Sequence, residues 1–230
     1  MTQAAPPAHR PIRSFVRREG RITAAQQQAL EQLLPRYAIP ADGTPVEPAA
    51  LFGRSAPLGL EIGFGDGAHL AALAQARPDW DFIGLEVYRP GVGKLLQAVA
   101  AQGLDNVRVS TEDAQAFLRE RLAPASLDAI YIQFPDPWPK KRHHKRRIVQ
   151  ADFALVLRDR LKPGGELQLA TDWAEYAEHM LEVLEATPGL RNATGPRAFS
   201  PRPANRIRTK FETRGQRLGH GVYDLVYRRD

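Results

Sequence analysis

One stretch of the sequence combines a stiff backbone with side chains that can do chemistry. Residues 134–147 read FPDPWPKKRHHKRR, with a proline at every second position of the first half. Proline fixes the backbone torsion φ and removes a hydrogen-bond donor, so this half is neither a helix nor an inner strand. Between the prolines lie one carboxylate, Asp136, and one indole, Trp138. We therefore expect a rigid loop that holds an acid and an aromatic ring in place for a ligand.

The second half of this stretch is a basic segment, residues 140–147. Its positive charges belong to Lys140, Lys141, Arg142, Lys145, Arg146 and Arg147. The chain has 32 basic and 26 acidic residues, which gives a net charge of +6. The segment alone carries a charge equal to this excess, and such a concentration is typical of proteins that bind a nucleic-acid backbone. The alternative interpretation is an ordinary solvated loop.

Further acidic residues lie in a glycine-rich motif and at the ends of predicted strands. Residues 61–67 read EIGFGDG. Gly63 and Gly65 let the backbone approach a ligand closely, and the helix predicted behind them favours negative groups at its N-terminus. Glu86 is placed to accept hydrogen bonds from both hydroxyls of a ribose. Asp113 is either a helix cap or an acceptor for the amino group of adenine.

These residues need a sheet to bring them together, and the apolar pattern predicts one. Strands are expected at 58–62, 81–86, 106–110, 127–134 and 166–171. Helices are expected at 68–76, 93–102, 114–121, 149–161 and 173–186. The alternation predicts an α/β fold with a mostly parallel sheet and helices on both faces. In such sheets ligands bind in a crevice at the carboxyl ends of the strands, where the acids described above would lie.

The two ends of the chain differ from this central pattern. Residues 1–21 are expected to form a flexible basic tail, followed in 22–57 by a helix capped by Thr23 and then a linker. Residues 58–230 form the α/β domain. Within it, Asp172 is expected to cap the last helix, and residues 206–229 are expected to add an antiparallel hairpin at the sheet edge.

Composition excludes several kinds of site. The chain has no cysteine, so it has no disulfide, no thiolate metal site and no cysteine nucleophile. The spacing of its histidines and acids suggests no metal site either. No apolar run approaches the roughly 20 residues that cross a bilayer, and the N-terminus lacks the apolar core of a signal peptide. We therefore expect a cytoplasmic protein without metal or membrane contact; monomer and homodimer both stay open.

Taken together, these motifs resemble the bacterial tRNA (guanine-N7-)-methyltransferases that act on guanosine 46 of the variable loop. The matching pieces are residues 61–67, 84–87, 113–114, 134–147, 163–165, 170–172 and 209–212. The first and the fifth are generic to methyltransferases, whereas 134–147 and 209–212, the latter reading TKFE, are highly specific. The resemblance covers the chain from about residue 58 onwards.

The resemblance implies a class I, Rossmann-like methyltransferase fold, S-adenosylmethionine as cofactor and tRNA as substrate. It implies a cofactor site made by Glu61, Gly63, Gly65, Glu86, Asp113 and Asp136. Asp136 would also be the catalytic residue. The tRNA substrate would be held by Lys140, Asp172, Thr209, Lys210, Phe211 and Glu212. Further RNA contacts would come from Arg142, His143, His144, Lys145, Arg146 and Arg147.

Three other functions stay open at this point. A nicotinamide-dependent oxidoreductase explains Gly63, Gly65, Ala68 and Glu86, because they satisfy the dinucleotide-binding pattern Gly-x-Gly-x-x-Ala. It leaves the proline-rich loop and the basic segment unexplained. A non-catalytic RNA-binding protein on the same scaffold explains the charge but not the acids around one crevice. A methyltransferase for a small molecule or a protein explains the core motifs but not the basic segment.

Overall fold

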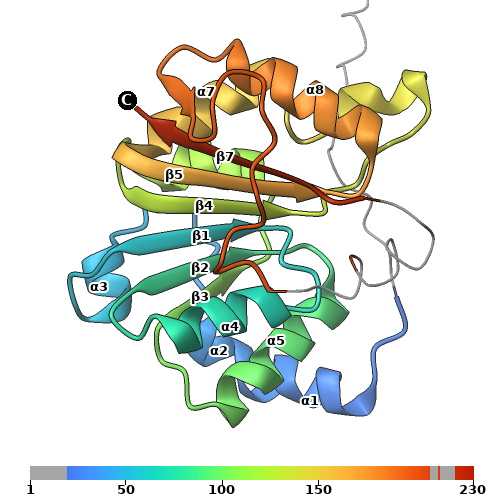
Figure 1. Ribbon diagram of the computed structural model, residues 1–230. Helices are drawn as coiled ribbons and strands as arrows, with labels where there is room; N and C mark the ends of the chain where they lie inside the picture. The colour runs from blue at the N-terminus through green and yellow to red at the C-terminus, as the bar shows by residue number, and fades with distance from the viewer. Residues whose placement is uncertain (1–19, 208–211, 213–220) are drawn as a thin grey trace, which may run out of the picture.

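The computed structural model describes residues 20–207, 212 and 221–230, and a seven-stranded sheet forms its centre. The strands are β1 (Leu58–Ile62), β2 (Asp81–Leu85), β3 (Val107–Ser110), β4 (Leu127–Gln133), β5 (Leu161–Thr171), β6 (Leu190–Asn192) and β7 (Tyr223–Arg229). Their order is β3-β2-β1-β4-β5-β7-β6, which Figure 1 shows from β3 at the bottom to β7 at the top. The first five strands run parallel, and β7 runs antiparallel to both of its neighbours. The predicted α/β class with a mostly parallel sheet is confirmed.

Helices cover both faces of the sheet. They are α1 (Ala24–Gln32), α2 (Leu34–Tyr37), α3 (Pro48–Phe52), α4 (Ala68–Ala76), α5 (Arg89–Ala101), α6 (Ala114–Ala116), α7 (Ala151–Arg160) and α8 (Ala174–Glu185). A π-helical turn, η1 (Phe117–Arg121), continues α6, and a 3-10 helix, η2 (Lys141–Arg146), follows the proline-rich loop. Apolar side chains of α1, α4 and α5 form one buried cluster, and those of η1, α7 and α8 form the other. All residues of β1 and β2 are buried between these two layers.

Besides shifts of one or two residues at the ends of other elements, two start positions and one helix cap differ from the sequence prediction. Helix α5 begins at Arg89 instead of residue 93, since Pro90 suits the first helical turn, where no backbone donor is needed. Strand β5 begins at Leu161, so the proline–glycine turn lies inside the extended segment. Asp172 is not the N-cap of α8; this position belongs to Trp173, whose N–H donates to Oγ1 of Thr171 at 3.3 Å.

The antiparallel edge is confirmed with different bounds. Strand β7 is the second arm of the expected hairpin, and its partner at the outer edge is β6, a short strand that the sequence did not predict. Isolated pairing between Ser200 and Asp224 extends this edge. Residues 208–211 and 213–220, where most of the first arm was expected, lie outside the described residues.

The segment before β1 packs against the same core. Thr23 and Gln26 form a reciprocal capping box at the start of α1, as the sequence indicated for Thr23. The side chain of Gln26 also donates to the carbonyl of Pro90 at 3.1 Å, which ties α1 to the start of α5. Further along, the N–H of Ile39 donates to the carbonyl of Val109 at 2.8 Å. No helix in the described part of the chain is long and apolar enough to cross a membrane.

Candidate functional site

A cleft of about 800 Å³ opens at the carboxyl ends of β1, β2 and β4. Five of the residues expected at a cofactor site line it: Glu61, Gly63, Gly65, Glu86 and Asp136. They come from three separate stretches of sequence, and the parallel pairing of β1 with β2 and β4 brings these strand ends side by side. The predicted crevice therefore exists, and its volume suits a ligand of nucleoside size.

The glycine loop between β1 and α4 shapes one wall of the cleft. Gly63 and Gly65 have φ of 70° and 58°, in the left-handed region that side chains disfavour. A Cβ built on either glycine would meet no atom within 4 Å, so both backbones face open space. A Cβ on Gly67, by contrast, would come within 2.5 Å of the side chain of Leu95. The first two glycines thus leave room for a ligand, and the third lets α4 pack against α5.

Glu86 holds this loop from the neighbouring strand. Its two carboxylate oxygens accept hydrogen bonds from the backbone N–H of Gly65 at 2.8 Å and of Tyr88 at 2.9 Å. Burial raises the pKa of Glu86, and these backbone hydrogen bonds offset part of the rise. Each carboxylate oxygen has a second lone pair, so the group can still accept from ligand hydroxyls.

Glu61 lies deeper, in a buried pair with His69 of α4. The side chains of Glu61 and His69 are 2% and 3% exposed, and Oε2 of the acid lies 3.2 Å from Nδ1 of the imidazole. The two atoms are close enough for an ion pair, but their geometry does not make a hydrogen bond. Oε2 therefore has no hydrogen-bond partner in the described part of the chain. The His69 ring also meets the Tyr131 ring edge-on at 5.6 Å. Glu61 is thus a buried acceptor with capacity for a cationic or donor group.

The proline-rich loop carries Asp136 at the mouth of the cleft, where it is exposed. The residues before Pro135 and Pro139, Phe134 and Trp138, have φ of 51° and 46°. Such values are uncommon for residues other than glycine and indicate a strained backbone that the surroundings must hold. The sequence predicted rigidity here but not this conformation, because a residue before proline is normally extended.

Contacts on both sides of Asp136 stabilise the strained loop. The N–H of Phe134 donates to the carbonyl of Ala170 in β5 at 2.8 Å, and the guanidinium of Arg206 lies over the Phe134 ring at 5.7 Å. The guanidinium of Arg146 lies over the Trp138 ring at 5.0 Å. Cation–π contacts of this kind stabilise by about 0.5–2 kcal/mol, depending on burial.

The basic segment folds into η2, and its side chains separate into two groups. Those of Lys140, Lys141, Arg142 and Lys145 are exposed, as expected for RNA contacts. Desolvation, followed by the charges of Arg142 and other basic neighbours, lowers the pKa of His143. His144 lies with Nε2 3.5 Å from Oε1 of Glu175.

Arg147 departs from the predicted RNA surface. Its side chain is 1% exposed and points into the protein, because the turn of η2 ends one residue earlier. Its Nε donates to the carbonyl of Pro137 at 2.9 Å, its Nη2 donates to Glu175 at 3.3 Å, and its guanidinium lies over the ring of Tyr176 at 4.9 Å. Arg147 therefore braces the loop that carries Asp136 and presents no charge to the surface.

The other predicted site residues lie around the cleft. Asp113 caps α6, where its side chain accepts from the N–H of Ala116 at 3.0 Å. Asp113 does not line the cleft, although its neighbours Glu112 and Ala114 do. Lys140 and Asp172 also lie outside the lining, the first at the end of the loop and the second after β5.

One member of the TKFE motif is described. Glu212 is 2% exposed and accepts from Arg202 at 3.1 Å and from Arg206 at 2.8 Å. Arg206 also donates to Asp224 of β7 at 3.0 Å and contacts Phe134, so this buried cluster connects Glu212 to the proline-rich loop. The other three members, Thr209, Lys210 and Phe211, lie outside the described residues.

The cleft has lining residues that the sequence interpretation missed. Residues from the N-terminal segment, including Gly20, Arg21 and Gln26, form part of its wall. The capping pattern predicted the helix there but gave no signal of where it packs. His69 and Gln133 also line the cleft, and both look like ordinary core positions in the apolar pattern.

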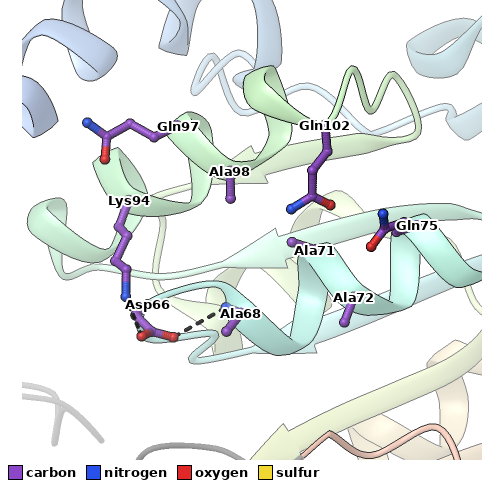
Figure 2. Close-up of a pocket in the computed structure, with 9 residues that line it drawn as sticks. All are labelled: Asp66, Ala68, Ala71, Ala72, Gln75, Lys94, Gln97, Ala98 and Gln102. Carbon is purple, nitrogen blue, oxygen red and sulfur yellow. Dashed lines mark hydrogen bonds and ion pairs between the residues drawn. The ribbon is translucent and has the colours of Figure 1, made fainter.

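A second pocket of about 490 Å³ lies between α4 and α5 (Figure 2). Its lining is mostly alanine and glutamine, and it shares Asp66, Ala68 and Lys94 with the cleft. The side chains of Asp66 and Lys94 pair at 2.6 Å, which ties the glycine loop to α5, as the dashed line between them shows. Within the described residues, no group of histidines and acids is arranged to hold a metal ion.

Comparison of the sequence with known families and proteins gives consistent matches. A family described as "Putative methyltransferase" matches residues 55–225. The tRNA (guanine-N(7)-)-methyltransferase of Acidithiobacillus ferrooxidans is 57% identical over 229 residues, which cover 100% of this chain and 99% of the relative. The enzyme of the same name from Alkalilimnicola ehrlichii is 56% identical over 222 residues, covering 96% and 93%.

Solved structures with a similar fold are also methyltransferases. The 16S rRNA (adenine(1408)-N(1))-methyltransferase from Catenulisporales acidiphilia matches with a TM-score of 0.53 at 19% identity, over 81% of this chain and 94% of the other. An rRNA methylase from Streptococcus thermophilus matches with a TM-score of 0.51 at 14% identity, over 91% and 99%. At such identities the likeness supports the fold alone, and it agrees with the expected class I architecture.

Proposed function

The chain belongs to the tRNA (guanine-N(7)-)-methyltransferase family, and we propose that it transfers a methyl group from S-adenosylmethionine to N7 of guanosine 46 in the tRNA variable loop. One observation supports this most directly. Asp136 stands on a braced loop between a cleft of nucleoside size and an exposed basic segment. A carboxylate in that position can reach both a cofactor in the cleft and a base of an RNA on the basic surface.

The cleft fits S-adenosylmethionine. Glu61 has a buried carboxylate oxygen without a hydrogen-bond partner in the described residues, which suits the ammonium group of the methionyl end. Gly63 and Gly65 leave open space for close approach, and Glu86 keeps acceptor capacity for the ribose hydroxyls. When bound there, the cofactor supplies an electrophilic methyl group on a sulfonium. The nicotinamide alternative uses the same glycines but no feature of the proline-rich loop or the basic segment.

The proposed reaction depends more on positioning the two reactants than on acid–base catalysis. Guanine N7 carries a lone pair and no proton at neutral pH, so no base is needed to generate the nucleophile. We propose that the carboxylate of Asp136 accepts from N1–H and N2–H of guanine, which orients the ring and increases the electron density at N7. Holding the two reactants in line and stabilising the developing charge are then the main contributions of the protein.

We propose that the exposed cations of the basic segment bind the tRNA backbone. Lys140, Arg142, Lys145 and the partly exposed Arg146 are the contacts that we assign, with His143 and His144 beside them. Asp172 and residues 209–211 are proposed to hold the substrate guanosine, and the buried Glu212, which pairs with Arg202 and Arg206, is proposed to position that motif. Arg147 is proposed as a positioning residue for the Asp136 loop.

The N-terminal part of the chain also enters the proposal. We propose that residues 22–57, together with Gly20 and Arg21, complete the cleft of the methyltransferase domain at 58–230, and that the basic residues before Gly20 face the RNA. A tRNA substrate further leads us to propose a cytoplasmic location.

The decisive experiment incubates the purified protein with S-adenosylmethionine and unmodified tRNA, and then maps N7-methylguanosine by cleavage at the modified base. We expect one modified position, guanosine 46, in tRNAs that have it, and no product on tRNA with adenosine there. Stabilisation against heat by S-adenosylmethionine, but not by nicotinamide dinucleotides, is expected in the same preparation. Methylation at another position would overturn the assigned substrate, and stabilisation by a nicotinamide dinucleotide alone would favour the oxidoreductase.

A further inference from the structure

Gln133 has a buried amide with no partner in the described part of the chain. It is the last residue of β4, it is 8% exposed, and it lines the cleft. Neither its Nε2 nor its Oε1 makes a hydrogen bond to any residue that the structure describes. A buried amide that makes no hydrogen bond destabilises the folded protein, so such a group commonly marks a place where a ligand completes the bonding.

The strand register places Gln133 near Glu61, deep in the cleft. Glu61 of β1 aligns with Tyr131 of β4, and Gln133 lies two residues further on, which puts its side chain on the same face of the sheet. The next position along β1 is Gly63, which has no side chain and faces open space. Among the described residues, the inner end of the cleft therefore combines two groups. One is a carboxylate whose Oε2 lies 3.2 Å from His69 but makes no hydrogen bond, and the other is an amide whose donor and acceptor make none either.

We propose that Gln133 binds the amino-acid end of the cofactor, an inference that rests on the proposed function. An α-amino-acid group carries an ammonium and a carboxylate on adjacent atoms. Glu61 offers an acceptor to the ammonium, and the NH₂ of Gln133 donates to the carboxylate. Glu86 lies at the end of β2, on the other side of the glycine loop, and is assigned to the ribose.

A contact of Gln133 with the substrate guanine fits the structure less well. The tRNA would approach over the basic segment, where Asp136 is exposed at the mouth of the cleft. Gln133 is buried three residues earlier and belongs to the sheet itself, on the face of Glu61. It therefore lies on the cofactor side of the cleft.

The test compares two ligands that differ only at the amino-acid end. S-adenosylhomocysteine has this end, whereas 5′-methylthioadenosine keeps the nucleoside and the sulfur without it. For Gln133→Met, calorimetry should show binding of S-adenosylhomocysteine weakened about tenfold to a hundredfold, as for loss of a hydrogen bond to a charged group. Binding of 5′-methylthioadenosine should stay within about twofold of wild type. Gln133→Glu keeps the size but loses the donors, and should weaken S-adenosylhomocysteine at least as much.

Stability of the ligand-free protein gives an independent measurement. Because Gln133→Met removes an unsatisfied buried amide, its melting temperature should rise by about 2–6 °C. Gln168→Met is the matched control: Gln168 lies on β5, is 5% exposed, and has an Oε1 without a partner in the described residues, but it does not line the cleft. That control should leave the binding of both ligands unchanged.

Three outcomes would overturn the inference about Gln133. Equal weakening of both ligands would assign the residue to the nucleoside or to the shape of the cleft. Unchanged binding of S-adenosylhomocysteine with slower tRNA methylation would assign it to guanine. A lower melting temperature of Gln133→Met would mean that the amide is already satisfied without ligand. If the wild-type protein binds neither S-adenosylmethionine nor S-adenosylhomocysteine, the proposed function itself fails, which a defect confined to the variants would not indicate.

Discussion

Replacing Arg147 with methionine should separate loop bracing from RNA binding. Methionine keeps most of the apolar stem and removes the guanidinium, which contacts Pro137, Glu175 and Tyr176. A hydrogen bond from a charged donor stabilises by about 1.5–3 kcal/mol. A buried cation–π contact adds about 2 kcal/mol. The ion pair adds little, up to about 1 kcal/mol, since Glu175 is 55% exposed.

The losses are partly offset, because Arg147→Met also removes the cost of keeping a charge out of water. We expect a net destabilisation of about 2–4 kcal/mol. For a chain of this length that corresponds to a fall in melting temperature of about 5–15 °C, measured by calorimetry. The single-turnover methylation rate should fall as well, since the loop carrying Asp136 loses its brace.

Arg142→Met is the matched control, because Arg142 is exposed on the same segment. Its melting temperature should stay within about 2 °C of wild type. In contrast, the slope of log affinity for tRNA against log salt should fall by about one unit, as for loss of one phosphate contact. Arg147→Met should leave that slope unchanged. A normal melting temperature with a reduced slope for Arg147→Met would refute the assignment and return Arg147 to the RNA surface.

Three further predictions concern charged residues of the site. Asp136→Asn should slow single-turnover methylation about a hundredfold to a thousandfold at saturating tRNA and cofactor, because the NH₂ of asparagine faces the N–H donors of guanine. A rate within a few-fold of wild type would leave Asp136 only a structural role. Burial raises the pKa of Glu86 in the folded state. Glu86 therefore stabilises the fold at pH values below the ordinary glutamate pKa, and this contribution is lost as the pH rises through the pKa of the folded state. Glu86→Gln should remove that pH dependence of the urea midpoint and weaken S-adenosylmethionine binding, and an unchanged profile would contradict the shift. Arg206→Met removes the guanidinium that pairs with the buried carboxylates of both Glu212 and Asp224, although Arg202 still contacts Glu212. The variant should lose about 3–5 kcal/mol in urea unfolding, and a loss below about 1 kcal/mol would mean that the cluster is not a structural unit.

The sequence predicts those features of the fold that repeat with the period of an element. Strand β1 and helix α4 have the bounds that the apolar pattern indicated, because each packs its whole apolar face into the core. Strand β6 escaped prediction, since it is three residues long and becomes a strand only by pairing with β7, far away in the sequence. The crevice is predictable once the strands are, because neighbouring parallel strands have their carboxyl ends at the same edge of the sheet.

The details of the site depend on tertiary contacts that local sequence does not encode. Six cations in one segment look alike in sequence, and only the turn of η2 decides that Arg147 faces inwards. The left-handed backbone of Phe134 and Trp138 is imposed by contacts with β5, Arg206 and Arg146, against the usual preference before proline. The roles assigned to the site residues stay predictions that the experiments above address.

The position of β7 has a consequence for how the protein is made. This strand leaves the ribosome after the other six, yet it lies between β5 and β6 in the finished sheet. While β7 is still inside the ribosome, the edge of β5 at residues 166–171 lacks the strand that later pairs with it, and β6 has no neighbour within the described sheet. Such an edge is a site where two nascent chains can pair with each other. We therefore expect ribosome-bound chains stalled before residue 223 to recruit chaperones, and release of β7 to end that interaction.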